Sequence, residues 1–155
     1  MQKFKFRLET VLHARQTAED FAEKAFSTAY GKWVLEKEKL TQLDMEFQKT
    51  VAERPGSRAG ERFDPADIFA RERYLETIMA AQEQQRRYVE TARMLAEEQR
   101  MQLLAAKQAR EAVSTLKDRD LAAHTYKMQQ IEQNNLDEKA AQQHIQKMNQ
   151  DSSLF

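Results

Sequence analysis

The chain has 155 residues, of which 32% are charged, with 25 basic and 25 acidic side chains, three glycines, two prolines and no cysteine. This composition favours a single domain built from good helix-forming residues, and it excludes disulfides and thiolate metal sites. No run of 18 apolar residues could span a membrane, the basic N-terminus lacks the apolar core of a secretory signal, and zero net charge provides no general attraction for nucleic acid.

The first predicted element is a helix from about residue 8 to residue 53. Its apolar or small residues recur at heptad spacing: Leu8, Val11, Ala18, Ala22, Ala25 and Ala29. After Ala29 the pattern moves by four residues to Trp33 and continues at Leu40, Leu43 and Phe47. A four-residue insertion in a heptad pattern is a stutter, which locally unwinds a coiled coil, so we expect a stutter near Gly31.

A loop at residues 54–64 follows, because this stretch and the next residue hold both prolines and two of the three glycines. Asp64 is a candidate N-cap of the next helix. Pro65 suits the first helical position, where its missing N–H costs nothing. Phe63 and Ile68 have the spacing of a hydrophobic staple.

The second predicted helix runs from residue 65 to about residue 148, with a frayed tail at 149–155. Its apolar stripe consists of Ile68, Leu75, Ile78, Val89, Ala92, Ala96, Leu103, Ala106 and Val113. The stripe is interrupted by three polar residues, Gln82, Gln85 and Gln99. A slip at about residues 117–121 leads to Met128 and Ile131.

Two helices joined by one short loop fold back on each other. The expected fold is therefore all-α, an antiparallel two-helix coiled-coil hairpin with helices of unequal length. Folding at the loop places Leu8 opposite about residues 110–113, so that everything after about Ser114 overhangs the first helix. The overhang carries Leu116, Leu121, Tyr126, Met128 and Ile131. An apolar stripe without an intramolecular partner predicts an intermolecular one, although the overhang could also fray or dimerise.

Catalytic and metal-binding motifs are absent from the sequence. The three histidines, His13, His124 and His144, are scattered and form no H-E-x-x-H pair, and His124 falls at a stripe position that favours packing. A two-helix hairpin also offers no water-excluding pocket of the kind that catalysis needs. We therefore expect neither an enzyme nor a cofactor.

Basic and acidic residues alternate along most of the chain, which is typical of solvated helical faces and not of a nucleic-acid interface. The exception is the N-terminal cluster of Lys3, Lys5 and Arg7, which is interleaved with Phe4 and Phe6. This cluster suits contact with another protein or with an anionic membrane surface.

The same N-terminal segment resembles a known family. Phe4-Lys5-Phe6-Arg7-Leu8-Glu9-Thr10-Val11-Leu12-His13-Ala14-Arg15 is similar to the opening F-x-F-R-L-x-x-V-L-x-x-R of the flagellar export protein FliJ family. Leu136-Asp137-Glu138-Lys139-Ala140 resembles the L-D-E-x-A stretch near the family's C-terminus. The Thr/Gln-Arg-Phe-like run that often follows in the family is replaced here by Gln142-Gln143-His144-Ile145. Two unequal helices with a loop near residue 60 match the family's organisation along the whole chain.

This resemblance implies a cytoplasmic protein of the type III export apparatus, peripheral at the inner membrane face of the flagellar base. Family members form a two-helix coiled coil similar to that of the rotary ATPase γ subunit. The implied partners are the hexameric export ATPase, the cytoplasmic domain of the export gate and export chaperones. The implied role is to promote ATPase activity and substrate export without an active site.

The resemblance also implies two binding surfaces. The expected ATPase-binding residues are Phe4, Phe6, Arg7, Leu8, Arg119, Asp137 and Glu138. The expected export-gate residues are Leu40, Leu43, Phe47, Tyr74, Ile78 and Ala81. The apolar members of both sets could instead pack between the helices, a reading that we prefer for Leu40 and Leu43. Tyr74 lies off the stripe and is the better surface candidate.

Two other functions remain open. The chain could be a generic coiled-coil scaffold or tether, or the equivalent stalk of a virulence-type secretion system. The N-terminal motif favours an export factor over a tether.

Overall fold

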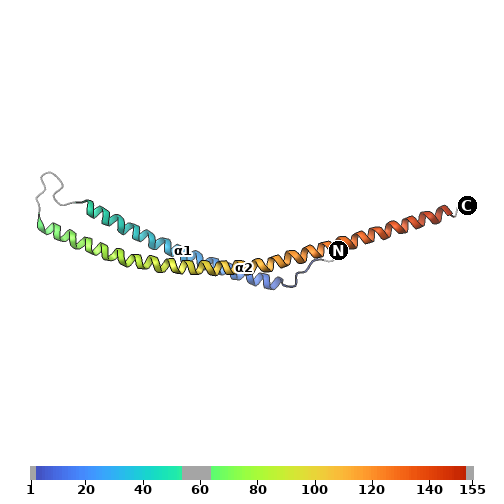
Figure 1. The fold of residues 1–155 in the computed structure, drawn as a ribbon, viewed down its shortest axis with the longest axis horizontal. Helices are drawn as coiled ribbons and strands as arrows, with labels where there is room; N and C mark the ends of the chain where they lie inside the picture. The colour runs from blue at the N-terminus through green and yellow to red at the C-terminus, as the bar shows by residue number, and fades with distance from the viewer. Residues whose placement is uncertain (1–2, 54–63, 153–155) are drawn as a thin grey trace. The chain divides into compact units, whose positions relative to one another are not determined.

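The structure, a computed structural model, describes residues 3–53 and 64–152, with side chains described as far as residue 148. It contains two helices, α1 (Glu9–Ala52) and α2 (Pro65–Ser152), of 44 and 88 residues (Figure 1). No strand occurs within these ranges. The predicted all-α hairpin class with helices of unequal length is thus confirmed.

The helix ends lie close to their predicted positions, with one exception. Residues 149–152, which were predicted as part of the tail, belong to α2, and residues 153–155 lie outside the described residues. The predicted loop falls almost wholly on residues 54–63, outside the described residues, and so does the Phe63 half of the predicted staple.

Asp64 caps the start of α2 as predicted. Its Oδ1 accepts a hydrogen bond from the backbone N–H of Ala66 at 2.9 Å, and its backbone carbonyl accepts one from the N–H of Asp67 at 3.1 Å. The side chain of Asp67 adds a negative charge in the first turn, which the positive end of the helix dipole favours. The helix α2 therefore begins at a well-defined N-cap.

The chain forms two compact units. One is Thr17–Lys107, and the other combines the N-terminal residues as far as Gln16 with the chain from Gln108 onward. Each contains a segment of α1 and a segment of α2.

The two helices are antiparallel in the unit of residues 17–107. Arg71 donates hydrogen bonds to the backbone carbonyls of Thr50 and Val51, at 3.0 and 2.9 Å. Further along α2, Gln85 donates to Glu36. Residue numbers on α1 thus fall as those on α2 rise, which is the arrangement of a hairpin.

The buried side of α2 in this unit follows an unbroken alternation of three- and four-residue steps from Ile68 to Ala106. This is the core spacing of a coiled coil. Every apolar residue predicted for the stripe over this range is buried or half-buried. Gln82, Gln85 and Gln99 also occupy stripe positions and are buried or half-buried, so they belong to the interface between the helices.

The predicted stripe of α1 is wrong in its first half. Val11, Ala18 and Ala25 are exposed. The buried side of α1 in this unit instead runs in the same alternating steps through Glu19, Ala22, Phe26, Ala29, Trp33, Glu36, Leu40, Leu43, Phe47 and Thr50. The step from Ala29 to Trp33 is an ordinary member of this alternation. The stutter expected near Gly31 is therefore absent.

In the other unit, the segment before α1 packs against α2. Phe6 is buried, with 5% of its surface exposed. The rings of Phe4 and His124 lie 5.6 Å apart, and the N-terminal segment follows α2 in this region (Figure 1). Lys117 on α2 forms an ion pair with Glu9 at 2.9 Å. The N-terminal residues thus cover α2 as far as His124.

These contacts correct two expectations about α2. Glu9 lies opposite Lys117, so the predicted pairing of Leu8 with residues 110–113 was several residues too early. Lys117 and His124 are both half-buried and seven residues apart, whereas Leu121 is exposed. The seven-residue spacing therefore continues from Lys117 to His124 without the predicted slip, and it changes only at Met128, four residues after His124.

The end of α2 has no companion within the described residues. Met128 is the last half-buried side chain, and every side chain from residue 129 to residue 148 is exposed. The predicted overhang exists, but it begins about two heptads later than expected.

Candidate partner-binding surfaces

The seven residues expected at an ATPase contact all lie in the unit that holds the N-terminus and the end of α2, and they differ in accessibility. Arg7, Arg119, Asp137 and Glu138 are exposed. Phe4 and Leu8 are half-buried, and Phe6 is buried. The aromatic residues of the N-terminal motif therefore hold the segment against α2, while the charged residues face solvent.

Asp137 and Glu138 lie in the unaccompanied part of α2. Asp137 accepts a hydrogen bond from the Nε2 of Gln133, one turn earlier, at 3.0 Å. Tyr126 and Gln130 are joined in the same way at 3.0 Å. Contacts of this kind within one helix stabilise it locally, so the acidic pair is displayed on a helix.

The six residues expected at an export-gate contact fall into two groups. Ile78 is buried, and Leu40, Leu43 and Phe47 are half-buried at stripe positions between the helices. Tyr74 and Ala81 are exposed. The surface of this set thus consists of two side chains on α2, and the other four lie in the interface between the helices.

Tyr74 also connects the two helices. Its hydroxyl donates a hydrogen bond to the Glu46 carboxylate. This hydrogen bond, with some desolvation and the negative charge of Glu46, raises the pKa of Tyr74 above its ordinary value. The ring is therefore held in one orientation while one side remains open to solvent.

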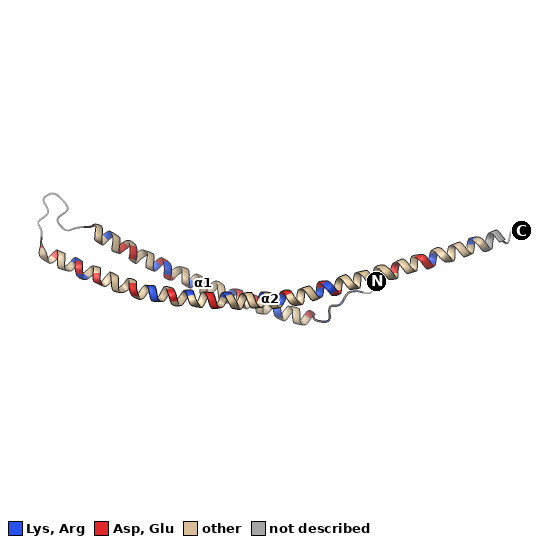
Figure 2. Cartoon of the chain, viewed as in Figure 1, with Lys and Arg blue, Asp and Glu red and all other residues tan. Residues whose placement is uncertain are grey.

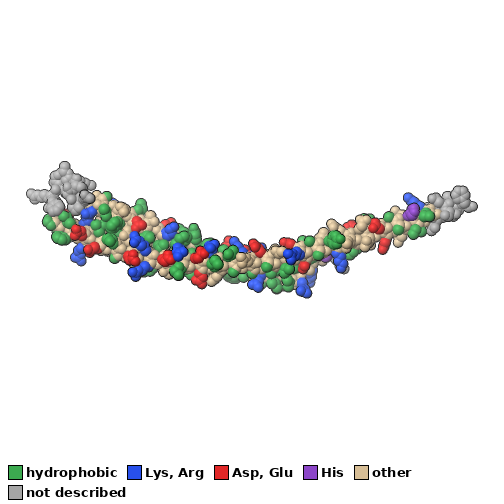
Figure 3. Space-filling model, in the orientation of Figure 1, with side chains coloured by type: hydrophobic (Ala, Val, Ile, Leu, Met, Phe, Trp, Pro, Cys, Tyr) green, Lys and Arg blue, Asp and Glu red, His purple; other side chains and the backbone are tan. Residues whose placement is uncertain are grey.

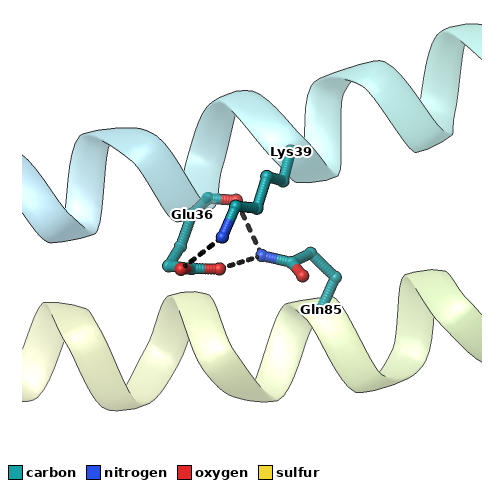
Figure 4. Close-up of polar contacts among 3 residues, drawn as sticks. All are labelled: Glu36, Lys39 and Gln85. Atoms are coloured by element: carbon teal, nitrogen blue, oxygen red, sulfur yellow. Dashed lines mark hydrogen bonds and ion pairs between the residues drawn. The ribbon is translucent and has the colours of Figure 1, made fainter.

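A second polar connection joins Glu36 and Lys39 on α1 to Gln85 on α2 (Figure 4). The Glu36 carboxylate accepts from the Lys39 Nζ at 2.8 Å and from the Gln85 Nε2 at 2.5 Å, and Gln85 also donates to the Glu36 carbonyl at 3.0 Å. The hydrogen bond from Lys39, followed by that from Gln85, lowers the pKa of Glu36. Similarly, the Nε2 of Gln82 donates to Asp44 at 2.8 Å.

Basic and acidic side chains alternate along both helices (Figure 2). On α2, Arg93 pairs with Glu90 at 2.7 Å and Arg100 with Glu97 at 2.8 Å, and all four side chains are more than half exposed. Exposed pairs of this kind contribute little to stability, because solvent screens the two charges. They make a solvated helix face, as the sequence predicts.

Exposed apolar side chains are spread between the charged ones over both helices (Figure 3). The described residues contain no group of three or more potential metal-binding side chains. No helix in the described ranges combines the length and apolarity that a membrane crossing requires.

The family model of the flagellar FliJ protein matches residues 4–149. The chain belongs to the FliJ family. The match includes both the N-terminal motif and the L-D-E-x-A stretch, and it confirms the resemblance noted in the sequence. No curated protein and no solved structure matches the chain.

Membership of the FliJ family gives the chain a role associated with flagellar protein export. The family consists of accessory proteins without catalytic activity.

Sequence reasoning missed one surface feature, an open groove between α1 and α2 near the Glu36–Gln85 connection. It is lined by Lys32, Lys39, Tyr88, Thr91, Ala92 and Leu95 around Glu36 and Gln85. The signal in the sequence was the seven-residue spacing of Lys32 and Lys39 and of Tyr88 and Leu95. That spacing gains meaning only when the pairing of the two helices is known.

Proposed function

We propose that this chain is an accessory component, or chaperone, of the flagellar type III export apparatus that promotes ATPase activity and substrate export. It binds the hexameric export ATPase as a γ-like stalk through its N-terminal unit, and it binds the cytoplasmic domain of the export gate through the Tyr74 side of α2. It acts in the cytoplasm at the inner membrane face of the flagellar base, where export chaperones are further partners.

The observation that carries this proposal is the unaccompanied end of α2. Leu136 and Ile145 are each 57% exposed, and no part of the described chain covers them. Exposed apolar side chains on a helix of this length favour insertion into a partner. The neighbouring charges of Asp137 and Glu138 would select the orientation, because charged groups at an interface determine specificity more than affinity.

The N-terminal motif contributes indirectly. Phe6 is buried, and Phe4 packs on His124. These contacts hold Arg7 on the segment that lies beside α2. Arg7 and Arg119 then supply exposed guanidinium groups, which suit carboxylates on the ATPase.

The ATPase contact is tested by measuring hydrolysis by the purified export ATPase with substoichiometric amounts of this chain. We expect stimulation by the wild type and a loss of most of it with the double variant Asp137→Lys/Glu138→Lys. The matched control is Glu97→Lys/Glu98→Lys, an adjacent acidic pair on the exposed surface of the other unit, and it should stimulate as the wild type does. A chain that leaves hydrolysis unchanged, as a simple tether would, contradicts the proposal.

The gate contact is tested separately by titrating the chain with the soluble gate domain. Tyr74→Ala and Ala81→Glu should weaken binding, because they alter the exposed pair and leave the buried residues of the same set in place. Tyr126→Ala, which removes an exposed tyrosine of the other unit, should bind as the wild type does. If Tyr74→Ala and Tyr126→Ala changed the affinity for the gate domain equally, the gate contact would not lie on the Tyr74 side of α2.

A further inference from the structure

The groove beside the Glu36–Gln85 connection runs between the two helices of the unit of residues 17–107, with a volume of about 340 Å³. One side is formed by Tyr88, Thr91 and Leu95 of α2, and the other by Lys32 and Lys39 of α1. Glu36 and Gln85, which are hydrogen-bonded to each other (Figure 4), also line the groove. All five side chains that form its sides are exposed.

Both sides of the groove repeat with a period of seven residues. Tyr88 and Leu95 are seven apart on α2, and Lys32 and Lys39 are seven apart on α1. Seven residues are two helical turns, about 10.5 Å along the axis. A third helix lying in the groove would meet this repeat with its own heptad spacing, whereas a small molecule or an extended peptide would not.

The exposed charges at the rim of the groove are positive. Lys32 and Lys39 are the cations, and the carboxylate of Glu36 is already bound by Lys39 and Gln85. Lys32 also attracts the Glu36 carboxylate electrostatically, and its side chain remains exposed. On the α2 side the lining residues are uncharged, and the Glu90–Arg93 and Glu97–Arg100 pairs do not line the groove. The rim is therefore apolar on one side and basic on the other.

We propose that this groove binds an amphipathic helix of a partner protein, whose apolar stripe packs on Tyr88 and Leu95 and whose flanking carboxylates pair with Lys32 and Lys39. The bound form is a three-helix arrangement along this part of the hairpin. The site is distinct from the unaccompanied end of α2 and from the Tyr74–Ala81 pair, so it stands whether or not those surfaces bind the ATPase and the gate.

A second copy of the chain fits the groove less well. Two copies that met through the same surface would share a two-fold axis. The lysines of one copy would then face either the lysines or the apolar side of the other, and the only carboxylate in the lining, that of Glu36, is already bound by Lys39 and Gln85. Like charges facing each other across an interface oppose binding. The basic rim therefore selects a partner that carries acidic residues beside its apolar stripe.

The test uses the full chain and two synthetic helical peptides of about four heptads. Both peptides carry the same leucine and alanine stripe, and they differ only in having glutamate or lysine at the flanking positions. Titration of each fluorescently labelled peptide with the chain gives Kd. We expect the glutamate-flanked peptide to bind at least about tenfold more tightly than the lysine-flanked one.

Two variants and one control locate the site. Leu95→Lys should weaken binding of the glutamate-flanked peptide by at least about tenfold, because it places a charge on the apolar side of the groove. Lys32→Glu should reduce or reverse the preference between the peptides. Met94→Lys is the matched control, since Met94 is also an exposed apolar residue of α2 but does not line the groove. Far-ultraviolet circular dichroism checks that each variant remains helical.

The proposal is overturned if the glutamate-flanked peptide does not bind, if both peptides bind equally, or if Met94→Lys weakens binding as much as Leu95→Lys. It is also overturned if the chain without peptide is a dimer that Leu95→Lys dissociates, because the groove would then belong to a second copy.

Discussion

At the scale of single residues, polar side chains in the interface between the helices contribute to specificity more than to stability. Gln82 is 8% exposed and donates a hydrogen bond to Asp44. Gln85 does the same with Glu36. A polar residue at a core position of a coiled coil costs stability and selects one register of the helices. The hairpin therefore has its register determined at two successive stripe positions.

Gln82→Leu is expected to raise the stability of the hairpin by about 1 kcal/mol, because it replaces a buried amide with apolar surface while the exposed Asp44 regains water. Thermal unfolding followed by circular dichroism measures this. Gln84→Leu, a matched change at an exposed position, should shift the midpoint much less. A lower midpoint for Gln82→Leu would show that the hydrogen bond to Asp44 stabilises the fold more than apolar packing would.

Glu36 predicts a dependence of stability on pH. Its hydrogen bonds from Lys39 and Gln85 hold its folded-state pKa below the ordinary value of 4.5. The stabilisation from these contacts is therefore complete above that value and is lost as pH falls through the lower folded-state pKa. We expect the thermal unfolding midpoint to decrease as the pH is lowered through this acidic range. In Glu36→Gln this decrease should be smaller. An unchanged slope in the variant would contradict the assignment.

At the scale of the helices, Gly31 is the weakest position of α1. It lies in the helix interior, and a Cβ added there would meet no atom within 4 Å. Gly31→Ala should therefore stabilise the hairpin by about 1 kcal/mol, through the lower entropy of the unfolded chain and the higher helix propensity of alanine. This should raise the melting midpoint by about 2–4 °C.

The matched control for Gly31→Ala is the reverse change at another exposed interior position of α1. Ala25→Gly should lower the midpoint by a similar amount, since Ala25 is exposed. If Gly31→Ala lowered stability instead, the glycine would have a role that its open surroundings do not show.

The two helices differ in how well their stripes could be predicted, and the reason is composition. On α2 the stripe holds mostly Ile, Leu, Val and Ala, so apolar spacing alone identifies it. On α1 the stripe includes Glu19 and Glu36, while the exposed side includes Ala18 and Ala25. A pattern of small and apolar residues therefore identifies part of the exposed side of α1 as the stripe. The predicted stutter arose because residues of the exposed side and of the buried side were taken as one stripe.

The candidate surfaces were predictable to different extents. Tyr74 could be placed on the surface because it departs from a clear heptad spacing. The packing of Phe4 and Phe6 on α2 could not be predicted from spacing, because residues 3–8 precede the helix. An extended chain advances about 3.3 Å per residue and a helix 1.5 Å. The N-terminal segment therefore reaches further along α2 than a helical count suggests.

At the scale of the whole molecule, folding and partner binding use different parts of the sequence. Among the side chains that the structure describes, the buried and half-buried ones extend no further than Met128, and those of residues 129–148 are exposed. Apolar burial is the main source of stability, so residues 129–148 contribute little to the free energy of unfolding. Their apolar side chains are explained better by an intermolecular contact than by the fold.

Removal of residues 129–155 should therefore separate stability from function. We expect the melting midpoint to change by less than about 2 °C, while stimulation of the export ATPase is lost, because the truncation removes Asp137, Glu138 and the exposed Leu136 and Ile145. A longer truncation that also removes Lys117 and His124 is the control. It deletes the partners of Glu9 and Phe4 and should lower the midpoint as well. If the shorter truncation destabilised the hairpin equally, the end of α2 would be part of the fold and the stalk interpretation would lose its support.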